Sequence, residues 1–285
     1  MLNAFTIDLE DWYQGIEFPI GRWSSCSKRV EKGLYRIFSL LEEYSVKATF
    51  FSLGWIAEKY PAMIKEIAAS GHELGSHGYS HEKVYSLTKD EFREEIKVTK
   101  NRLEDLIGKP VTTHRSPFFS ITSKSLWALD ILKKEGIEID CSISPVKTWR
   151  YGIKSCPDCI FRIREADIVE FPVSSFRFFG MTWGIGGANF RLLPCKITKD
   201  ALDRRMKLGK QNMFYIHPWE YDENHPKVRM NWKAGITHYA RLSKTLPNTV
   251  SLLKNYKFGT VSDVVLNYQN KFGGLSQISI DHLQE

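Results

Sequence analysis

The chain has 285 residues, 42% hydrophobic and 26% charged, which is enough apolar material for one large domain or two small ones. Forty Lys and Arg against 33 Asp and Glu give a formal net charge of +7. The basic residues do not form a dense stripe interleaved with aromatic residues, so the composition argues against a nucleic-acid-binding protein. An anionic glycan, a nucleotide-linked sugar or a membrane surface remains open as a partner.

The first residues lack a basic segment, Asp8 interrupts the first apolar stretch, and no apolar run approaches the ~20 residues that cross a bilayer. We therefore expect a cytoplasmic protein without a transmembrane segment, for which peripheral membrane contact stays open. Five cysteines without a secretion signal favour reduced thiols over disulfides. Cys156 and Cys159 have the spacing of half a zinc site or a redox pair, but two loop thiols are the simpler interpretation because no second Cys/His pair lies nearby.

Strand-like and helix-like segments alternate along the chain. The helix after Thr88 has a capping-box signature, since Glu91 follows three residues later, and a stop signal at Gly108. In chain order we expect a strand at 4–8, a helix at 28–43, a strand at 47–51, helices at 62–69, 88–107 and 123–134, strands at 137–140, 168–171 and 213–216, a helix at 239–255 and a strand at 258–260.

This alternation predicts an α/β fold with a parallel sheet or barrel, whose catalytic residues collect at the carboxyl ends of the strands. Residues 147–194 break the pattern and are interpreted as an insertion or lid. We expect one catalytic domain over residues 1–268 and a polar C-terminal tail over 269–285.

Acids and histidines follow several of the predicted strands. Asp8, Glu10 and Asp11 follow the first strand, and His77 and His81 follow a later one. On a helical turn the two histidines would share a face. Two imidazoles with a carboxylate form a ligand set for a divalent metal, so metal-dependent hydrolysis is the first hypothesis.

Five motifs in order resemble the polysaccharide deacetylase superfamily, carbohydrate esterase family 4 with the NodB-homology fold. The resemblance spans residues 3–265 and implies a distorted (β/α) barrel with the 147–194 insertion. Gly78 departs from the family pattern, in which a hydroxyl residue is usual. The motifs are Thr6-Ile7-Asp8-Leu9-Glu10-Asp11, Ser76-His77-Gly78-Tyr79-Ser80-His81, His114-Arg115-Ser116-Pro117-Phe118, Asp140-Cys141-Ser142-Ile143-Ser144-Pro145 and Ile216-His217-Pro218-Trp219-Glu220.

The wording of the first and last motifs also resembles a cytoplasmic branch associated with surface-polysaccharide and exosortase systems. Asp-Leu-Glu-Asp-Trp at 8–12 and Tyr-Ile-His-Pro-Trp-Glu at 215–220 carry this closer resemblance, together with Glu-Phe-Pro at 170–172.

The resemblance implies that Asp8 is the general base and that Arg115 pairs with it. It implies that His77 and His81 are metal ligands with an acidic third ligand, but Leu9 stands where that acid is usual. Glu10 lies on the same side of an extended strand as Asp8, whereas Asp11 could turn inward if the strand ends at Asp8. We predict Asp11, with Glu10 as the alternative.

His217 would be the general acid that protonates the leaving amine, and Asp140 would orient that histidine or its neighbours. The backbone N–H of Phe118 could donate to the oxyanion. Trp12 and Trp219 flank the first and last motifs and could stack on a sugar, although core positions explain them as well. The metal would be zinc, with cobalt, nickel and manganese compatible.

Simpler structural roles also exist for these side chains. Asp8 or Asp11 could cap a helix, Arg115 could form a surface ion pair, and His217 could be a satisfied core histidine. Asp140 could simply start a turn.

The sequence thus predicts a metal-dependent hydrolase that removes an N-acetyl group from an amino sugar in a glycan or in a lipid-linked or nucleotide-linked precursor. Two alternatives stay open, a cyclic ureide or small-amide hydrolase on the same fold and a catalytically inactive carbohydrate-binding relative. The sequence does not fix the sugar or the oligomeric state.

Overall fold

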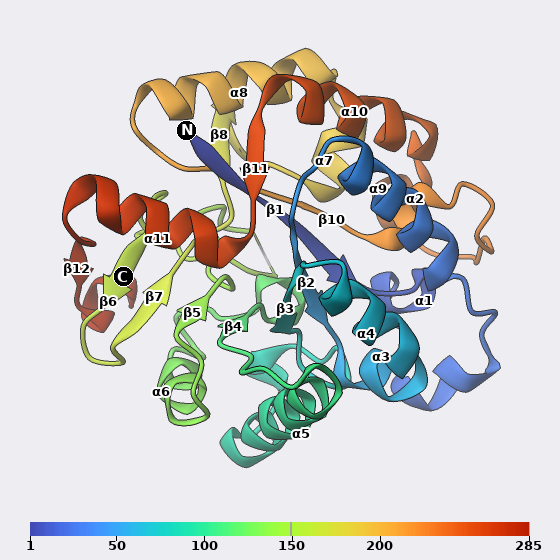
Figure 1. The fold of residues 1–285 in the computed structure, drawn as a ribbon, viewed down its shortest axis with the longest axis horizontal. Coiled ribbons are helices and arrows are strands. Elements are labelled where there is room, and N and C mark those ends of the chain that lie inside the picture. The colour runs from blue at the N-terminus through green and yellow to red at the C-terminus, as the bar shows by residue number, and fades with distance from the viewer. Residues whose placement is uncertain (149, 285) are drawn as a thin grey trace.

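The computed structural model of the chain describes residues 1–148 and 150–284 (Figure 1). Its main sheet has ten strands, and a separate hairpin has two. The strands of the main sheet are β1 (Leu2–Leu9), β2 (Thr49–Ser52), β3 (Glu73–Ser76), β4 (Thr113–His114), β5 (Ile139–Asp140), β6 (Phe161–Ile163), β7 (Ile168–Glu170), β10 (Met213–Ile216), β11 (Lys257–Gly259) and β12 (Gln277–Ile278). The hairpin consists of β8 (Ser175–Phe178) and β9 (Met181–Gly184).

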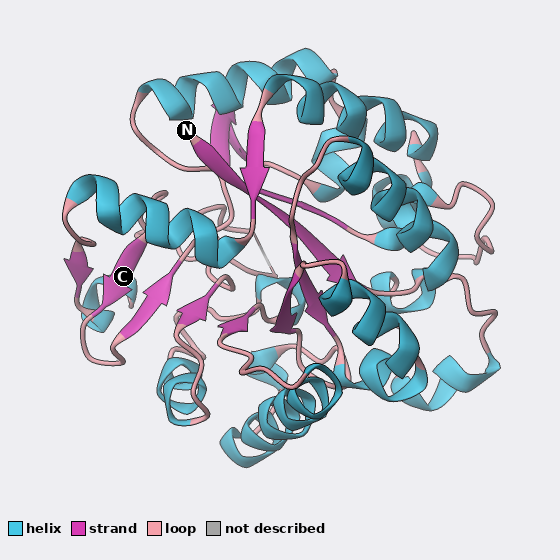
Figure 2. Ribbon diagram, in the orientation of Figure 1, coloured by secondary structure: helices cyan, strands magenta, loops and turns pink. Residues whose placement is uncertain are grey.

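Helices surround the strands on several sides (Figure 2). They are α1 (Trp12–Gly15), α2 (Val30–Glu43), α3 (Gly54–Lys59), α4 (Pro61–Ala69), α5 (Lys89–Ile107), α6 (Trp127–Lys134), α7 (Gly187–Leu192), α8 (Cys195–Lys207), α9 (Trp232–Tyr239), α10 (Thr245–Asn255) and α11 (Val261–Phe272). Short 3₁₀ turns lie at Ile20–Ser25, Val84–Ser86, Pro117–Phe119, Pro218–Tyr221, Leu242–Lys244 and Ile280–Leu283.

The strand order is β10-β1-β2-β3-β4-β5-β7-β6-β12, with β11 also pairing with β1. Every pairing in this sheet is parallel except that of β6 with β7. The predicted α/β fold with a parallel sheet is therefore confirmed. Parallel strands place their carboxyl ends at one edge, which brings together residues that are far apart in the sequence.

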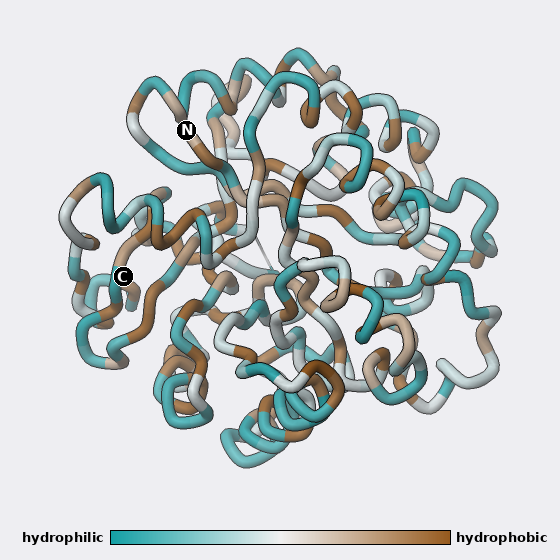
Figure 3. Tube along the Cα trace, in the orientation of Figure 1, coloured by the Kyte–Doolittle hydropathy of each residue, from teal (hydrophilic) through white to brown (hydrophobic). Residues whose placement is uncertain are grey.

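β1 lies at the centre of this arrangement, between β10, β11 and β2. Residues 3–9 of this strand are buried, on both of its faces. Strands covered on both faces form near-continuous apolar runs, as this one does except at Asn3, Thr6 and Asp8. Figure 3 shows the same pattern, with hydrophobic colour along the inner strands and hydrophilic colour on much of the outer helices. A buried carboxylate such as that of Asp8 needs a hydrogen-bonding or charged partner, and this partner lies in the candidate active site.

Two sequence expectations about the second half of the chain are corrected. Residues 147–194 are not a single insertion, because β6 and β7 belong to the main sheet and only the β8–β9 hairpin stands apart. The end of the chain is not simply a polar tail. β12 pairs with β6, and the Leu283 side chain is buried in the core. Regular backbone pairing and one buried leucine hold this segment, and neither produces a long periodic pattern.

Most of the predicted helices are present, and the Thr88 capping box is confirmed by bonds in both directions between Thr88 and Glu91. Six helices were missed, α1, α3, α7, α8, α9 and α11. The start of α11 carried a signal, because Thr260 and Asp263 form a capping box. Among the described residues, none of the helices has the length and apolar character needed to cross a membrane. All five cysteines are free thiols, and burial raises the pKa of both Cys156 and Cys159.

Candidate active site

Glu10, His77 and His81 converge at the carboxyl ends of β1 and β3. The Glu10 Oε1 atom lies 3.1 Å from His77 Nε2 and 2.8 Å from His81 Nε2. All three side chains are buried, and their ligand atoms lie within 4.8 Å of one another. A carboxylate and two imidazoles at this spacing suit a divalent metal, so the residues fit the group that the sequence predicts.

The two histidines meet through a loop and not through a helical turn. Residues 77–81 are irregular, and both Gly78 (φ 72°) and His81 (φ 59°) adopt left-handed backbone. Gly78 therefore stands where a residue without a Cβ is favoured. The left-handed backbone of His81 is a strained conformation of the kind that clusters at functional sites. The two rings end 5.4 Å apart between centroids.

His77 is fixed in the tautomer that a metal ligand needs. Its Nδ1 lies 2.6 Å from the backbone carbonyl oxygen of Arg115, which can only accept a hydrogen bond. Nδ1 must therefore carry a proton, and the lone pair of Nε2 faces Glu10 and His81. Such a second hydrogen bond is the usual way in which a ligating histidine is oriented.

The prediction of Asp11 as the acidic ligand is wrong. Asp11 caps α1, and its carboxylate accepts hydrogen bonds from the backbone N–H groups of Trp12, Arg29 and Val30. The reason is the end of β1. The strand continues to Leu9, so Asp8 and Glu10 point to the same side, and Asp11 begins the helix. The capping role considered for Asp11 is the one that the structure has.

Asp8 is held by Arg115, as predicted. Arg115 Nη1 donates to Asp8 Oδ1 at 2.6 Å and to Thr6 Oγ1 at 2.9 Å. Thr6 and Asp8 are two residues apart on β1, so both reach the same guanidinium. Arg115 is completely buried, with its guanidinium carbon 4.3 Å from the centroid of the Phe51 ring. The surface ion pair considered for Arg115 is thus excluded.

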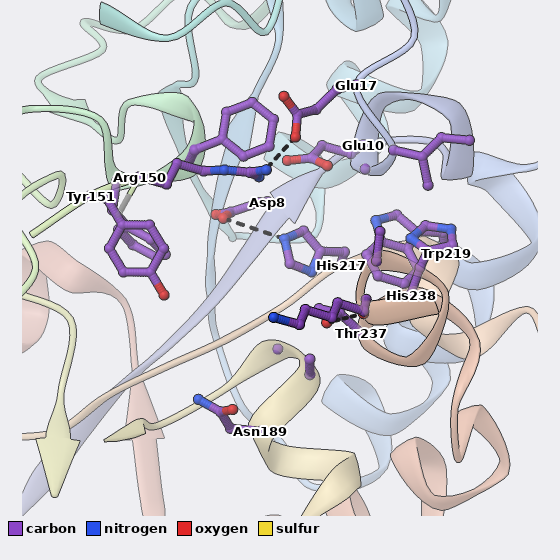
Figure 4. A pocket seen from close by; sticks show the side chains of 18 of the residues that line it. Asp8, Glu10, Glu17, Arg150, Tyr151, Asn189, His217, Trp219, Thr237 and His238 are labelled. Carbon is purple, nitrogen blue, oxygen red and sulfur yellow. Dashed lines mark hydrogen bonds and ion pairs between the residues drawn. The ribbon is translucent and has the colours of Figure 1, made fainter. Parts of the chain in front are cut away.

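His217 follows β10 and faces Asp8 across the site (Figure 4), with its Nε2 atom 3.8 Å from Asp8 Oδ2. Its other ring nitrogen, Nδ1, lies 2.7 Å from Glu220 Oε1. Glu220 Oε2 accepts a hydrogen bond from Arg191 Nε at 2.7 Å, and both of these side chains are fully buried. A carboxylate beside Nδ1 keeps the proton there and leaves Nε2 directed at Asp8.

Charges in this cluster shift two of the pKa values in opposite directions. Burial alone would raise the pKa of Glu10, but the nearby His81, His217 and His77 side chains lower it well below 4.5. Burial alone would lower the pKa of His217, but Glu10, Glu220 and Asp8 raise it to about 9. Near neutral pH, the cluster therefore holds ionised Glu10 next to protonated His217.

Asp140 does not orient His217, the first of the two roles predicted for it. It is fully buried and accepts a hydrogen bond from Ser142 Oγ at 2.5 Å, and Ser142 Oγ in turn accepts one from the backbone N–H of Ser116. Asp140 also bonds the carboxyl group of Glu170, and burial raises the pKa of both groups. Asp140 supports the loop that follows Arg115, and the orienting role belongs to Glu220.

A cavity of about 800 Å³ opens over these groups. Asp8, Glu10, His81 and His217 form part of its lining. The opposite parts of the lining come from the second half of the chain. They include Arg150, Tyr151, Asn189, Lys233, Thr237 and His238. Arg150 pairs with Glu17 at 2.8 Å (Figure 4).

The three aromatic residues predicted to bind substrate have different positions. Phe118 lines the cavity, and its ring lies 4.6 Å from that of His81. Trp219 also lines it and stacks on His217 and His238, with centroids 5.1 and 4.1 Å away. Trp12 packs in the core, where its Nε1 donates to the Ser27 carbonyl oxygen, so its predicted contact with substrate is wrong.

Sequence reasoning missed Glu220, Arg191 and His238. Glu220 carried a signal, because it follows His217 at the three-residue spacing of a capping box, and the structure shows that box. Arg191 lies in a segment without a motif, and His238 was assigned only a structural role. Tertiary packing places both residues at the site, and no local sequence spacing indicates that position.

The geometry defines an α/β protein with a candidate metal centre and a base–acid pair at the carboxyl edge of a parallel sheet. Residues 27–139 match the polysaccharide deacetylase family model, and residues 141–266 match a family described as a domain of unknown function, DUF3473. Residues 27–139 therefore carry a polysaccharide deacetylase domain, as the family resemblance predicted. The closer resemblance to one cytoplasmic branch stays a prediction.

Curated relatives agree with this family. A peptidoglycan-N-acetylglucosamine deacetylase of Bacillus cereus is 34% identical over 117 residues, which are 37% of this chain and 42% of that protein. A peptidoglycan deacetylase of Helicobacter pylori is 31% identical over 113 residues, which are 40% of this chain and 38% of that protein. The alignments thus span about two-fifths of these relatives.

Solved structures share the fold. A protein of Mycobacterium smegmatis, assigned as a polysaccharide deacetylase, matches with a TM-score of 0.65 and 17% identity over 97% of this chain and 92% of that one. A peptidoglycan N-acetylglucosamine deacetylase matches with a TM-score of 0.51 and 19% identity over 97% and 90%. The expected barrel-type α/β architecture is confirmed by these likenesses.

Proposed function

We propose that this protein is a metal-dependent hydrolase that removes the N-acetyl group from an amino sugar in a glycan or a glycan precursor. The observation that carries the proposal is the constellation of Asp8 and His217 on either side of Glu10, next to two histidines at metal-ligand spacing. A base, an acid and a metal centre at the floor of one cavity are the parts that amide hydrolysis requires. The curated relatives named as deacetylases support the choice of reaction.

Glu10, His77 and His81 would hold the metal. Two imidazoles and a carboxylate suit zinc, and they are also compatible with cobalt, nickel and manganese. When bound, such an ion acts as a Lewis acid toward the acetamide carbonyl and lowers the pKa of a coordinated water. The open side of this ligand set faces the cavity that Glu10 and His81 line.

Asp8 is the general base in this proposal. Its Oδ1 atom is occupied by Arg115 at 2.6 Å, so Oδ2 is the oxygen left to accept a proton from the attacking water. Arg115 also fixes the direction of the carboxylate, because it bonds Thr6 and Asp8 together. The base is therefore oriented before substrate arrives.

His217 is the general acid. Glu220 and Asp8 favour the protonated imidazole, and Glu220 fixes the Nδ1 proton, so Nε2 delivers its proton into the cavity. An amine leaves a tetrahedral centre only when its nitrogen is protonated, which makes this donor necessary for an amide substrate. The backbone N–H of Phe118, at the cavity wall, remains our proposal for an oxyanion donor.

The test is acetate release from N-acetylglucosamine oligomers, nucleotide-linked N-acetyl sugars and lipid-linked glycans. Metal-stripped protein is assayed alone and after addition of zinc or cobalt. We expect metal-dependent acetate from at least one substrate, and at least about 10²-fold less from Asp8→Asn. Silence across the panel in the presence of stoichiometric metal would reject the proposal. Ring opening of cyclic ureides, seen as formation of the ring-opened carboxylate, would then identify the small-amide hydrolase, and sugar binding without turnover would identify the inactive relative.

A further inference from the structure

The β8–β9 hairpin ends in an exposed apolar tip. Phe179 is 85% exposed and Met181 is 56% exposed. Phe178 pairs with Met181 in the register, so Phe179 and Gly180 form a two-residue loop between the strands. The hairpin does not join the main sheet, and its tip therefore stands apart from the core.

Turn chemistry does not account for phenylalanine at this position. Phe179 and Gly180 have positive φ values of 48° and 75°, a hairpin turn that favours Asn-Gly or Asp-Gly. The Phe179 ring contacts that of Phe178 at the tip. Its ring centroid lies 4.4 Å from that of Phe178, and Trp183 Nε1 donates to the Phe178 carbonyl oxygen. The tip is thus an aromatic cluster that solvent surrounds.

The segments that carry the hairpin and the outer pocket wall have an unusual charge. Residues 171–199 contain four Lys or Arg and no Asp or Glu, and residues 224–262 contain seven Lys or Arg and no Asp or Glu. These segments together carry +11, whereas the rest of the chain carries −4, which gives the overall +7. The basic excess of the sequence therefore lies in these two segments, where Arg191 alone is buried and paired with Glu220 and Lys233 lines the pocket.

The same two segments border the pocket. β9 leads into Gly187 and Asn189, which line the cavity, and Gly186 forms a bridge with Tyr215 beside it. Figure 4 shows Asn189 on one side of the cavity and Thr237, from the second segment, on another. The base of the hairpin is thus fixed at the rim.

Helix α9 adds a second exposed apolar pair. Trp232 is 70% exposed and Ile236 is 47% exposed, and they lie one helical turn apart on the same side. The ammonium group of Lys233 lies 5.5 Å from the centroid of the Trp232 ring. Aromatic rings next to lysines suit the boundary between lipid headgroups and acyl chains.

We propose that the β8–β9 tip and the exposed side of α9, whose segments both reach the pocket, dock on an anionic lipid bilayer. Phe179 and Met181 insert among the lipids, and the exposed basic side chains on β8 and around α9 face the headgroups. These are Arg177, Lys227, Arg229 and Lys233. A soluble polyanion would gain from the charge but not from the apolar tip, so the exposed Phe179 favours a bilayer. Docking brings the pocket rim to the lipid surface. A membrane-anchored glycan is then the expected substrate class, an extension that rests on the proposed function.

Sedimentation with lipid vesicles tests the docking directly. The full-length protein is mixed with vesicles of phosphatidylcholine alone or with added phosphatidylglycerol. We expect binding to the anionic vesicles that weakens as salt rises. The tip variant Phe179→Ser/Met181→Ser should bind at least about tenfold more weakly, a loss of the apolar insertion term. Leu266→Ser is the matched control, because Leu266 is 58% exposed on α11, outside both segments. It should bind like the parent.

The charge is tested by Lys227→Gln/Arg229→Gln, with Lys109→Gln/Lys124→Gln as the control pair of exposed lysines elsewhere. Only the first pair should weaken binding. No binding to anionic vesicles at low salt would overturn the proposal. Equal binding by the tip variant, with competition by dextran sulfate, would also overturn it and would indicate a polyanion site.

Acetate release from soluble N-acetylglucosamine oligomers is measured on the same proteins. The tip variant should retain the parent's rate, since neither altered residue lines the cavity. Acetate release without vesicle binding rejects the docking alone. Vesicle binding without acetate release rejects the proposed function alone. Thermal unfolding of each variant shows that a loss of binding is not a loss of the fold.

Discussion

The metal side and the acid side of the pocket are built in different ways. On the metal side, Asp8, Glu10 and His77 lie at strand ends, and the base and ligands contact one another or Arg115 directly. On the acid side, His217 also follows a strand, but its hydrogen bonds connect it through Glu220 to Arg191 on α7. Arg191 donates in turn to carbonyl oxygens of residues 237 and 240, at the end of α9.

This difference shows which side-chain positions short sequence motifs can predict and which depend on tertiary packing. The metal side follows from strand ends in one parallel sheet, so short motifs describe it. The acid side depends on helices from the second half of the chain, where sequence periodicity says little about contacts. The two sides also differ in surroundings, because the second half provides most of the outer pocket wall.

The largest expected effect separates the two acids after β1. Glu10→Gln should lose bound metal and all turnover, because it removes the carboxylate that contacts both histidines. Asp11→Asn should keep its metal and lose stability only, about 1 kcal/mol, as a weakened helix cap does. Metal content by mass spectrometry and the midpoint of urea unfolding measure both. Loss of metal in Asp11→Asn but not in Glu10→Gln would show that Asp11 is the acidic ligand, as the sequence predicted.

Asp8→Asn should leave the metal in place and lower turnover by about 10²–10⁴-fold, the usual range for a lost general base. The amide still accepts hydrogen bonds from Arg115 but cannot take up the proton. The measurement is the rate of acetate release at saturating zinc, with metal content determined on the same sample. Co-loss of metal would mean that Asp8 is a ligand and not the base.

A smaller loss is expected on the acid side. Glu220→Gln should lower turnover by about 10²-fold, because it removes the charge that orients and protonates His217. Asp140→Asn is the comparison, since Asp140 bonds Ser142 and not His217. It should affect unfolding more than turnover. A larger loss of turnover in Asp140→Asn than in Glu220→Gln would return the orienting role to Asp140.

The smallest effect concerns stability and pH. Burial lowers the pKa of His238 to about 3, whereas an unfolded histidine titrates near pH 6.5. Below pH 6.5 this histidine is therefore protonated in the unfolded chain but not in the folded chain. The free energy of unfolding then falls as the pH falls toward 3. His238→Phe should reduce this slope by about 1.4 kcal/mol per pH unit between pH 6 and 4. Exposed His282→Phe should not, as urea unfolding at several pH values would show.

The sequence predicted the fold and the metal-side residues because they depend on strand ends and motif order. The main error on the metal side was the choice of Asp11 as the acidic ligand, one residue away from Glu10. Whether Asp11 turns inward depends on where β1 stops, and the strand runs through Leu9. Strand ends are set by backbone pairing with neighbours far away in sequence, in this case Ser52 opposite Leu9. The acid side was predicted only as far as His217, because Arg191 reaches Glu220 through packing that no local pattern encodes.

The bonds from Arg191 to the end of α9 connect the pocket wall to the proton donor. Thr237 lines the cavity, its carbonyl oxygen accepts from Arg191, and Arg191 holds Glu220 against His217. A ligand that displaces α9 will therefore also displace the imidazole. Poorly fitting sugars should then be rejected in the rate of bond cleavage, kcat, and not only in the concentration needed to fill the pocket. Selectivity in this protein would be enforced after binding, at the moment of proton transfer.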